Sequence, residues 1–175
     1  MAFHDEPELD APTLLRARRG EEGACQALVE RYQRPVFALL SRMIGRGPSV
    51  EDLAQETFLR AFRSLDRFDL QGPARLSTWL LTIAARQAID FLRKARPLEV
   101  SALRIAPGSA ELRSALAQAI SALPPDFRAT FLLREAHGFS TAEVAEALGV
   151  EEGTVKSRLS RAREALRNAL GDFHD

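Results

Sequence analysis

Residues 153–167, GTVKSRLSRAREALR, concentrate positive charge near the end of the chain. The segment holds one acidic residue, Glu164, and five basic residues: Lys156, Arg158, Arg161, Arg163 and Arg167. The whole chain is neutral, because 24 Lys and Arg balance 24 Asp and Glu. Such a concentration of long cationic donors is suited to phosphates or to the acceptor edges of bases. The alternative is a solvated face, since the last turn of a helix often carries Lys and Arg.

The preceding residues, FSTAEVAEALGVEEG, favour DNA binding by this segment. Ser140 or Thr141 can cap a helix over 141–148, and Gly149 permits the positive φ of a tight turn into a second helix over 152–170. This is the layout of a helix-turn-helix. In the second helix the apolar residues form one stripe, and the polar and basic residues face elsewhere; the stripe consists of Val155, Leu159, Ala162 and Leu166.

A second basic segment, 75–96, contains five basic residues and one acidic residue. Arg86, Arg93 and Lys94 share one face of the predicted helix with Asp90, and Arg75 and Arg96 stand at its ends. We interpret this face as a second nucleic-acid surface. Trp79 lies on the same helix, where an aromatic ring can stack on an unpaired base, but the apolar periodicity favours a core position for it.

The pair Asp52 and Glu56 lies one helical turn apart, a spacing that suits acid–base or metal chemistry. No histidine, nucleophile or glycine-rich loop accompanies the pair, and the three histidines of the chain are scattered. We therefore predict no catalytic residue, no metal site and no cofactor. The face is either solvated or docks on a protein, and periodicity does not separate these two possibilities.

The elements that carry these residues are helices, because apolar positions recur at helical spacing and strand signals are almost absent. The pattern predicts helices over 28–43, 50–65, 76–96, 112–122, 125–136, 141–148 and 152–170, with Ser49 and Asp52 capping the second and Pro35 kinking the first. We expect an all-α protein of two small domains, with a disordered acidic tail over 1–12, a domain over 13–96, a flexible linker over 97–111 and a helix-turn-helix domain over 112–175. No apolar run is long enough to span a membrane. The single cysteine, Cys25, is consistent with a reducing cytoplasm.

Two ordered blocks of motifs resemble one family. SVEDLAQETFLRAF, then FD, STWLLTIA and AIDFLRKAR, is similar to the first conserved domain of extracytoplasmic-function (ECF) sigma factors. ALPPDFRATFLLREAHGFSTAEVAEALGVEEGTVKSRLSRAREALR resembles their second domain. The resemblance runs from about Leu14 to Leu170. It implies a bacterial transcription initiation factor without catalytic activity, which binds core RNA polymerase, recognises and opens promoter DNA, and is held by a cognate anti-sigma factor.

The resemblance also implies roles for particular residues. The residues that match the polymerase-docking segment are Asp52, Gln55, Glu56 and Arg60. The candidate residues on the segment that matches the minus-ten surface are Arg75, Trp79, Arg86, Asp90, Arg93 and Lys94. Those that match the minus-thirty-five reader are Thr154, Lys156, Ser157, Arg158, Ser160, Arg161 and Arg163. Of these, Lys156, Ser157, Ser160 and Arg161 are candidates for contacts with base edges, and Arg158 and Arg163 for contacts with phosphates. Arg86 departs from the asparagine that family members often have there, and we hypothesise that it adds a phosphate contact.

Three other functions are compatible with parts of the pattern. A stand-alone helix-turn-helix regulator explains the C-terminal motif but leaves the block from Asp52 to Trp79 unexplained. A helical enzyme would use Asp52 and Glu56 on a bound metal. An adaptor would occupy polymerase without starting transcription.

Overall fold

The structure, a computed structural model, describes residues 8–94 and 109–171. These residues form helices and turns and contain no β-strand, which confirms the all-α prediction. The N-terminal half contains α1 (Ala11–Arg18), α2 (Glu22–Ile44), α3 (Pro48–Ser64), a short 3₁₀ turn η2 (Leu65–Arg67) and α4 (Leu76–Lys94). The C-terminal half contains α5 (Ser109–Ala122), α6 (Pro125–Phe131), a π-type turn η3 (Leu132–Ala136), α7 (Thr141–Leu148) and α8 (Glu152–Leu170). Among the described helices, none combines the length and apolar character that a bilayer crossing requires.

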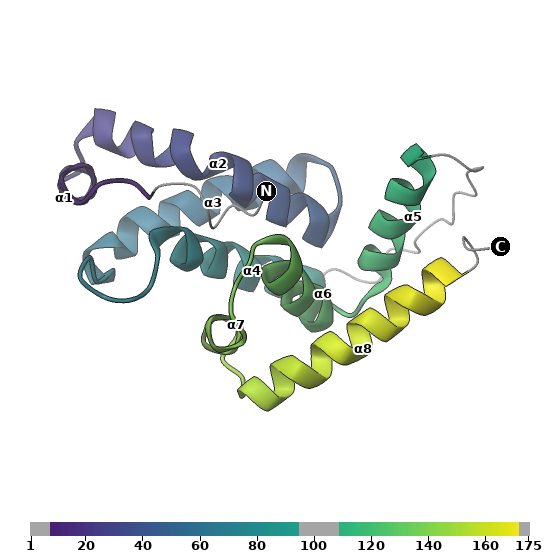
Figure 1. Ribbon diagram of the computed structural model, residues 1–175. Coiled ribbons are helices and arrows are strands. Elements are labelled where there is room, and N and C mark those ends of the chain that lie inside the picture. Colours follow the sequence, from purple (N-terminus) through teal and green to yellow (C-terminus); the bar gives the residue numbers. More distant parts are fainter. Residues whose placement is uncertain (1–7, 95–108, 172–175) are drawn as a thin grey trace.

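Helices α2, α3 and α4 pack on one another and form the body of the N-terminal half (Figure 1). Each buries the apolar stripe that its sequence periodicity predicts, and one buried polar pair joins α3 and α4. The amide of Gln87 in α4 donates to the hydroxyl of Thr57 in α3 at 3.0 Å, and that hydroxyl donates to the Leu53 carbonyl at 2.7 Å. Helix α2 continues through Pro35, which is buried. The periodic helices are therefore also the helices that form the core.

Helix α1 is a correction to the predicted tail over 1–12. The side chain of Asp10 accepts a hydrogen bond from the Thr13 amide at 2.8 Å, and Pro12 lies in the first turn, where its missing amide costs nothing. Leu14 and Ala17 are buried against α2, so the chain is already part of the fold by Asp10. Residues 1–7 of the predicted tail lie outside the described residues.

Of the N-terminal helix caps predicted from the sequence, the one for α3 was wrong and the one for α7 is present in the structure. Helix α3 begins at Pro48 after Gly47 and has no side-chain cap, so the prediction of Ser49 as cap was wrong. Proline is favoured at the first helical position, and it sets the start at residue 48, two residues before the predicted start at residue 50. Of the two predicted caps of α7, Ser140 and Thr141, Ser140 is the cap: its hydroxyl accepts from the Glu143 amide, and the Glu143 carboxylate accepts from the Ser140 amide at 2.7 Å.

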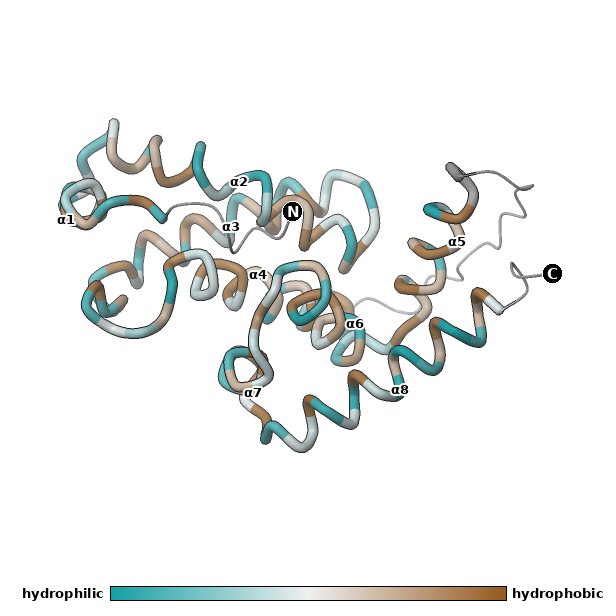
Figure 2. The backbone as a smooth tube through the Cα atoms, in the orientation of Figure 1, coloured by the Kyte–Doolittle hydropathy of each residue, from teal (hydrophilic) through white to brown (hydrophobic). Residues whose placement is uncertain are grey.

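In the C-terminal half, α8 lies along α5, α6 and α7 (Figure 1). Its hydrophobic and hydrophilic residues alternate at helical spacing (Figure 2), and the hydrophobic ones are buried. Helix α5 begins at Ser109, so residues 109–111 belong to a helix and not to the predicted linker. Residues 97–108 of that linker lie outside the described residues.

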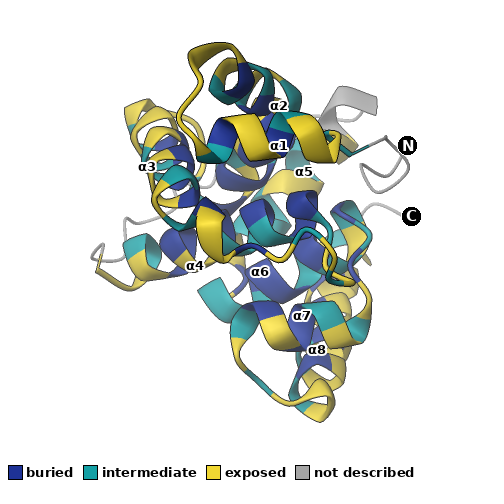
Figure 3. Cartoon of the chain, turned by 90° about the vertical axis from the view of Figure 1, so that its left-hand side faces the viewer, coloured by how far each residue is buried: buried dark blue, intermediate teal, exposed yellow. Residues whose placement is uncertain are grey.

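The two halves share one apolar core. A contiguous cluster of buried side chains extends from Leu14 in α1 to Leu159 in α8, and α4 contacts both α6 and α7. Figure 3 shows the buried positions of α4, α6 and α7 between outer faces that are exposed. The promoter-reading helices predicted from the two halves are therefore held in one body in this structure.

Candidate nucleic-acid interfaces

Helix α8 presents a polar face to solvent, opposite its buried stripe of Val155, Leu159, Ala162 and Leu166. Five predicted minus-thirty-five residues are exposed on it: Lys156, Ser157, Ser160, Arg161 and Arg163. The other two, Thr154 and Arg158, are half-buried. The buried stripe fixes the rotation of α8, so the exposed face is available to a long polyanion.

The cations of α8 differ in their partners. Arg163 pairs with Glu135 at 2.5 Å, and Arg158 approaches Asp126 to 3.8 Å with only 19% of its side chain exposed. Lys156 and Arg161 make no ion pair or side-chain hydrogen bond with any described residue. Among the predicted minus-thirty-five residues, Lys156 and Arg161 are thus the cations without a partner in the described chain, whereas Arg158 and Arg163, the two predicted phosphate ligands, each lie within ion-pair distance of a carboxylate.

The turn before α8 has the geometry that the sequence predicts. Gly149 adopts φ 65° and ψ 42°, in the left-handed region. The Val150 amide donates to the Ala145 carbonyl at 3.0 Å, which satisfies one of the carbonyls that the end of α7 leaves without an intrahelical donor. Ala145 is buried where α7 and α8 meet. Helix α7 and this turn hold α8 as the second helix of a helix-turn-helix.

The predicted minus-ten residues fall on α4 and on the segment before it. Trp79 packs on the core and against Phe68, with 5.3 Å between the ring centroids, but it remains half-buried. Asp90 and Lys94 are exposed, and neither forms an ion pair with a described residue. The remaining three arginines of this set are engaged within the chain.

Two of those arginines, Arg86 and Arg93, contact the C-terminal half. Arg86 donates to the carbonyl of Ala147 at 2.7 Å and to that of Glu146 at 3.2 Å. One guanidinium nitrogen of Arg93 donates to both carboxylate oxygens of Asp126, at 2.9 and 3.0 Å. Sequence periodicity places both arginines on an exposed face but carries no information on these contacts, because they depend on how the halves pack.

The predicted polymerase-docking residues lie along the outer face of α3. Asp52, Gln55 and Arg60 are exposed and Glu56 is half-buried. Arg60 donates to Glu56 at 2.7 Å, and this hydrogen bond lowers the pKa of the Glu56 carboxyl. A shallow hollow between α3 and α4 brings Glu56 and Arg60 together with Asp90 and Lys94 of the predicted minus-ten set. Nowhere in residues 8–94 and 109–171 do three or more His, Cys, Asp or Glu side chains gather as metal ligands.

Comparison with known proteins assigns the chain to a family. Residues 28–97 match sigma-70 region 2, and residues 113–166 match sigma-70 region 4. The ECF RNA polymerase sigma factor SigW of Bacillus subtilis (strain 168) is 33% identical over 91% of this chain and 96% of its own length. The ECF RNA polymerase sigma-E factor of Escherichia coli (strain K12) is 36% identical over 92% of this chain and 94% of its own length. The chain belongs to the ECF sigma factors.

Solved structures agree with this assignment. The sigma factor RpoE of Bartonella quintana, in complex with the anti-sigma factor NepR, superposes with a TM-score of 0.67 at 26% identity, covering 83% of this chain and 96% of that one. CnrH, in complex with the cytosolic domain of CnrY, superposes with a TM-score of 0.68 at 28% identity, covering 94% of this chain and 97% of that one. In this ECF sigma factor, region 2 spans most of α2 and all of α3 and α4, and region 4 spans most of α5 and α8 with α6 and α7 between them.

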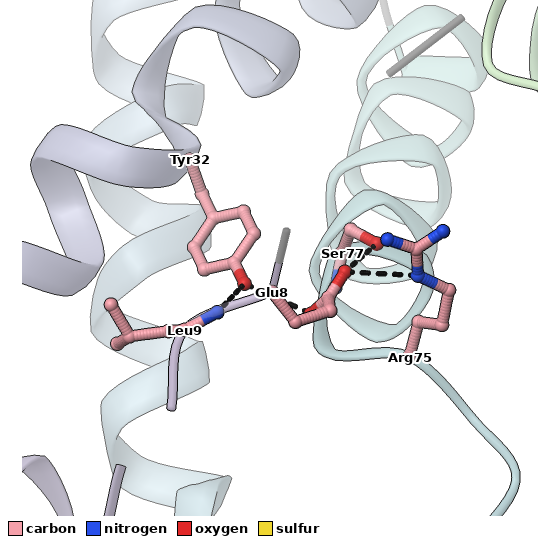
Figure 4. A network of polar contacts seen from close by, with 5 residues as sticks. All are labelled: Glu8, Leu9, Tyr32, Arg75 and Ser77. Carbon is pink, nitrogen blue, oxygen red and sulfur yellow. Dashed lines mark hydrogen bonds and ion pairs between the residues drawn. The ribbon is translucent and has the colours of Figure 1, made fainter. Parts of the chain in front are cut away.

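One feature of this ECF sigma factor lies outside the region 2 match and was not predicted. Glu8, ahead of α1, inserts its carboxylate between α2 and the start of α4 (Figure 4). The carboxylate accepts from the hydroxyls of Ser77 at 2.6 Å and Tyr32 at 2.9 Å, and from Arg75 at 3.1 Å. The Tyr32 hydroxyl in turn accepts from the Leu9 amide at 3.1 Å. Arg75, a predicted minus-ten residue, is thereby tied to the N-terminal segment.

Proposed function

We propose that this sigma factor binds core RNA polymerase through α3, reads the minus-ten element with α4 and the segment before it, and reads the minus-thirty-five element with α8. The single observation that carries the proposal is the exposed cationic face of α8, which α7 and a left-handed Gly149 turn present to solvent. A reader helix of this kind places side chains against base edges in the major groove.

In the minus-thirty-five reader, Lys156 and Arg161 are the leading candidates for base contacts, since both are exposed and have no partner among the described residues. Ser157 and Ser160 are exposed beside them and are suited to bases or phosphates. Arg158 and Arg163 reach phosphates once they leave Asp126 and Glu135. Thr154, in the first turn of α8, is the remaining residue that we propose for the minus-thirty-five contact.

In the minus-ten reader, Trp79 supplies a half-exposed ring for an unstacked base, and Arg75, Arg86, Arg93 and Lys94 supply cations for the strand. Opening the duplex costs stacking free energy, and capture of an unstacked base offsets that cost. Replacing Arg86 with Asn tests its role in reading: unchanged preference across a panel of minus-ten variants rejects that role.

On the polymerase side, we propose that Asp52, Gln55, Glu56 and Arg60 dock on the core enzyme, which brings both DNA readers to the promoter. Each half makes only a few phosphate contacts, so binding to DNA alone is weak and salt-sensitive. Attachment to polymerase raises the effective concentration of both readers near the DNA. The protein itself performs no catalysis and acts in the cytoplasm, where polymerase and DNA meet.

A cognate anti-sigma factor is the remaining proposed partner. RpoE of Bartonella quintana, which has the same fold, was solved bound to one. A protein that covers α3, α4 or α8 would block the proposed polymerase and DNA contacts together.

Run-off transcription tests the proposal. Purified chain and core RNA polymerase are mixed with a pool of linear DNA fragments randomised at both promoter elements, and transcripts are sequenced. The proposal predicts starts that depend on the added chain and share two sequence elements. Association with polymerase but no start at any fragment identifies an adaptor instead, and tight sequence-specific binding without polymerase identifies a stand-alone regulator.

Alanine variants then test the α8 face. Lys156→Ala and Arg161→Ala are each expected to lower promoter affinity of the holoenzyme by about 5- to 100-fold and to relax the preference at one base pair. Arg34→Ala is the matched control, because Arg34 on α2 is also exposed and has no ion pair or side-chain hydrogen bond with a described residue. Equal losses in all three variants would show that net charge alone matters.

A further inference from the structure

The loop over 68–75, which joins the η2 turn to α4, is held at its start by α1. Arg18, in the last turn of α1, donates to the Leu65 carbonyl at 3.0 Å and to the Phe68 carbonyl. The ring of Phe68 is buried and packs against Trp79, with 5.3 Å between the ring centroids. Arg18 therefore fixes the backbone of the residue on which the Trp79 ring packs.

The same loop is held at its end by Glu8, ahead of α1 (Figure 4). The Glu8 carboxylate accepts from Arg75, the last residue of the loop, at 3.1 Å. It also accepts from the hydroxyl of Ser77 at 2.6 Å and from its amide at 3.3 Å. The first amides of a helix lack intrahelical acceptors, and the helix dipole favours a negative charge there. Glu8 thus supplies a charged cap to the start of α4.

Between these two anchors the loop makes few polar contacts. Among the described residues, those at 69–74 form hydrogen bonds only with one another: the Gln71 amide donates to the Asp69 carboxylate at 2.9 Å, and the Gly72 amide donates to the Asp69 carbonyl at 3.2 Å. Leu70 packs partly on the core. The hydrogen bonds that join the loop to the segment ahead of region 2 are therefore at its two ends.

We propose that the segment over 8–18 positions the minus-ten reader by fixing both ends of this loop. Arg18 and Glu8 are its positioning residues. The ring and the cation of the reader, Trp79 and Arg75, are thereby held in one arrangement before the DNA strand arrives, and less free energy is lost in ordering them on binding. The inference rests on the proposed function of α4 and the segment before it. Neither positioning residue belongs to the proposed DNA or polymerase contacts, so changing it removes no proposed ligand.

The test compares Glu8→Ala and Arg18→Ala with Arg16→Ala, each as the holoenzyme with core RNA polymerase. Arg16 also lies in α1, but its side-chain partner is Glu21 on the surface, 2.7 Å away. The template is a promoter recovered in the run-off selection. Opening is followed by the fluorescence of 2-aminopurine placed in the minus-ten element, which rises when the base unstacks. Base preference is measured across a panel of minus-ten variants.

Positioning predicts that Glu8→Ala and Arg18→Ala each slow opening by about 3- to 30-fold, since each removes hydrogen bonds of a charged group. Both variants are also expected to reduce the preference among minus-ten variants by about the same factor. Arg16→Ala is expected to leave the opening rate close to that of the wild type, because an exposed ion pair contributes little. Affinity for core polymerase and the effect of minus-thirty-five substitutions are expected to stay unchanged in all three variants.

Two further variants separate positioning from a loss of stability. Thr57→Val removes the buried hydrogen bond between α3 and α4 but none of the hydrogen bonds of the loop, so it shows how destabilisation alone affects opening. Urea unfolding measures the stability of every variant. Glu8→Gln keeps the length of the side chain and an acceptor for the Ser77 hydroxyl, and it is expected to open at a rate between those of Glu8→Ala and the wild type. It takes the place of Glu8→Ala if that variant does not fold.

Unchanged opening and base preference in either the Glu8 or the Arg18 variant overturns the inference. A defect no larger than that of Thr57→Val at equal loss of stability also overturns it. Run-off transcription of the wild type separates this result from the fate of the proposed function. A wild type that starts transcription, with variants that open like it, overturns only the inference. A wild type that starts none overturns the proposed function and the inference with it.

Discussion

The carboxylate of Glu8 accepts a hydrogen bond from the hydroxyl of Ser77 at 2.6 Å, although 69 positions separate the two residues. Ser77 is buried in the first turn of α4, and Glu8 joins it to Tyr32 of α2 (Figure 4). The segment ahead of region 2 is thus bound to the start of the helix that is proposed to read the minus-ten element.

Glu8→Ala is expected to lower the free energy of unfolding by about 1–3 kcal/mol, because the hydroxyls of Ser77 and Tyr32 lose an ionised acceptor in a partly buried site. Urea unfolding followed by circular dichroism measures the change. Glu21→Ala is the control: Glu21 pairs with Arg16 on the surface, where solvent screens the pair, so its loss is expected to lower the free energy of unfolding much less than Glu8→Ala does. Equal losses would show that the Glu8 contacts add nothing to an ordinary surface pair.

Arg128→Met is expected to cost about 2–4 kcal/mol of unfolding free energy. Arg128 donates to the carbonyls of Met43, Ser121 and Leu123, and burial lowers its pKa, so its charge is tolerated only with these acceptors. Methionine fills the volume but leaves the carbonyls without donors. Thermal and urea unfolding measure the effect.

Arg134→Met is the comparison, since Arg134 is half-buried and donates to the Phe139 carbonyl at 2.8 Å within its own half. Its replacement is expected to cost about 1 kcal/mol. A loss for Arg128→Met no larger than this would mean that the contact between the halves contributes little to stability.

Local signals in the sequence predicted the helices well. Helices α3 and α8 have apolar residues at helical spacing, and S-x-x-E at Ser140 is a complete capping signal within four residues. The start of α3 was misplaced because two local signals competed there, and Pro48 prevailed over Ser49. Helix α1 was missed although Asp10 and Pro12 signal its start, because its eight residues give too short a periodic pattern.

The arrangement of the candidate site was not predictable from such signals. Arg86 has the pattern of an exposed cation, and only the packing of α4 against α7, 61 positions later, gives it carbonyl partners. Glu8 likewise stood in a predicted tail. Contacts between residues so far apart in the sequence produce no periodic pattern in a single sequence. The residue types therefore predicted which helix faces carry charge, but not which groups of the chain those charged side chains contact.

Two glycines near the reader helix are expected to respond in opposite directions to alanine. Gly149 adopts φ 65° with no atom within 4 Å of an added Cβ, so Gly149→Ala suffers only backbone strain, about 1 kcal/mol or more. Gly153 lies in the first turn of α8, equally free of neighbours, and Gly153→Ala is expected to stabilise by about 0.5 kcal/mol. Thermal unfolding of both variants measures the difference, and equal shifts would contradict the left-handed turn.

His137 is expected to make stability depend on pH. Burial, reinforced by the charge of Arg42, lowers the pKa of His137 from 6.5 to about 4, and neither ring nitrogen has a hydrogen-bond partner in the structure. Between about pH 6.5 and 4 the unfolded chain binds a proton at this residue and the folded chain does not. The free energy of unfolding therefore falls as the pH drops through this range, by up to about 3 kcal/mol, and this contribution levels off below about pH 4.

The measurement is urea unfolding at a series of pH values for the wild type and His137→Gln. Carboxylates with lowered pKa, such as that of Glu56, also destabilise the fold in acid, but they are unchanged in the variant, so the difference between the two curves isolates the histidine. The difference is expected to change steadily from about pH 6.5 to 4 and to be flat above pH 7. Arg42→Gln removes a nearby positive charge and is expected to make the slope shallower. Parallel curves for the wild type and His137→Gln would mean that the imidazole accepts its proton in the folded state as easily as in the unfolded chain.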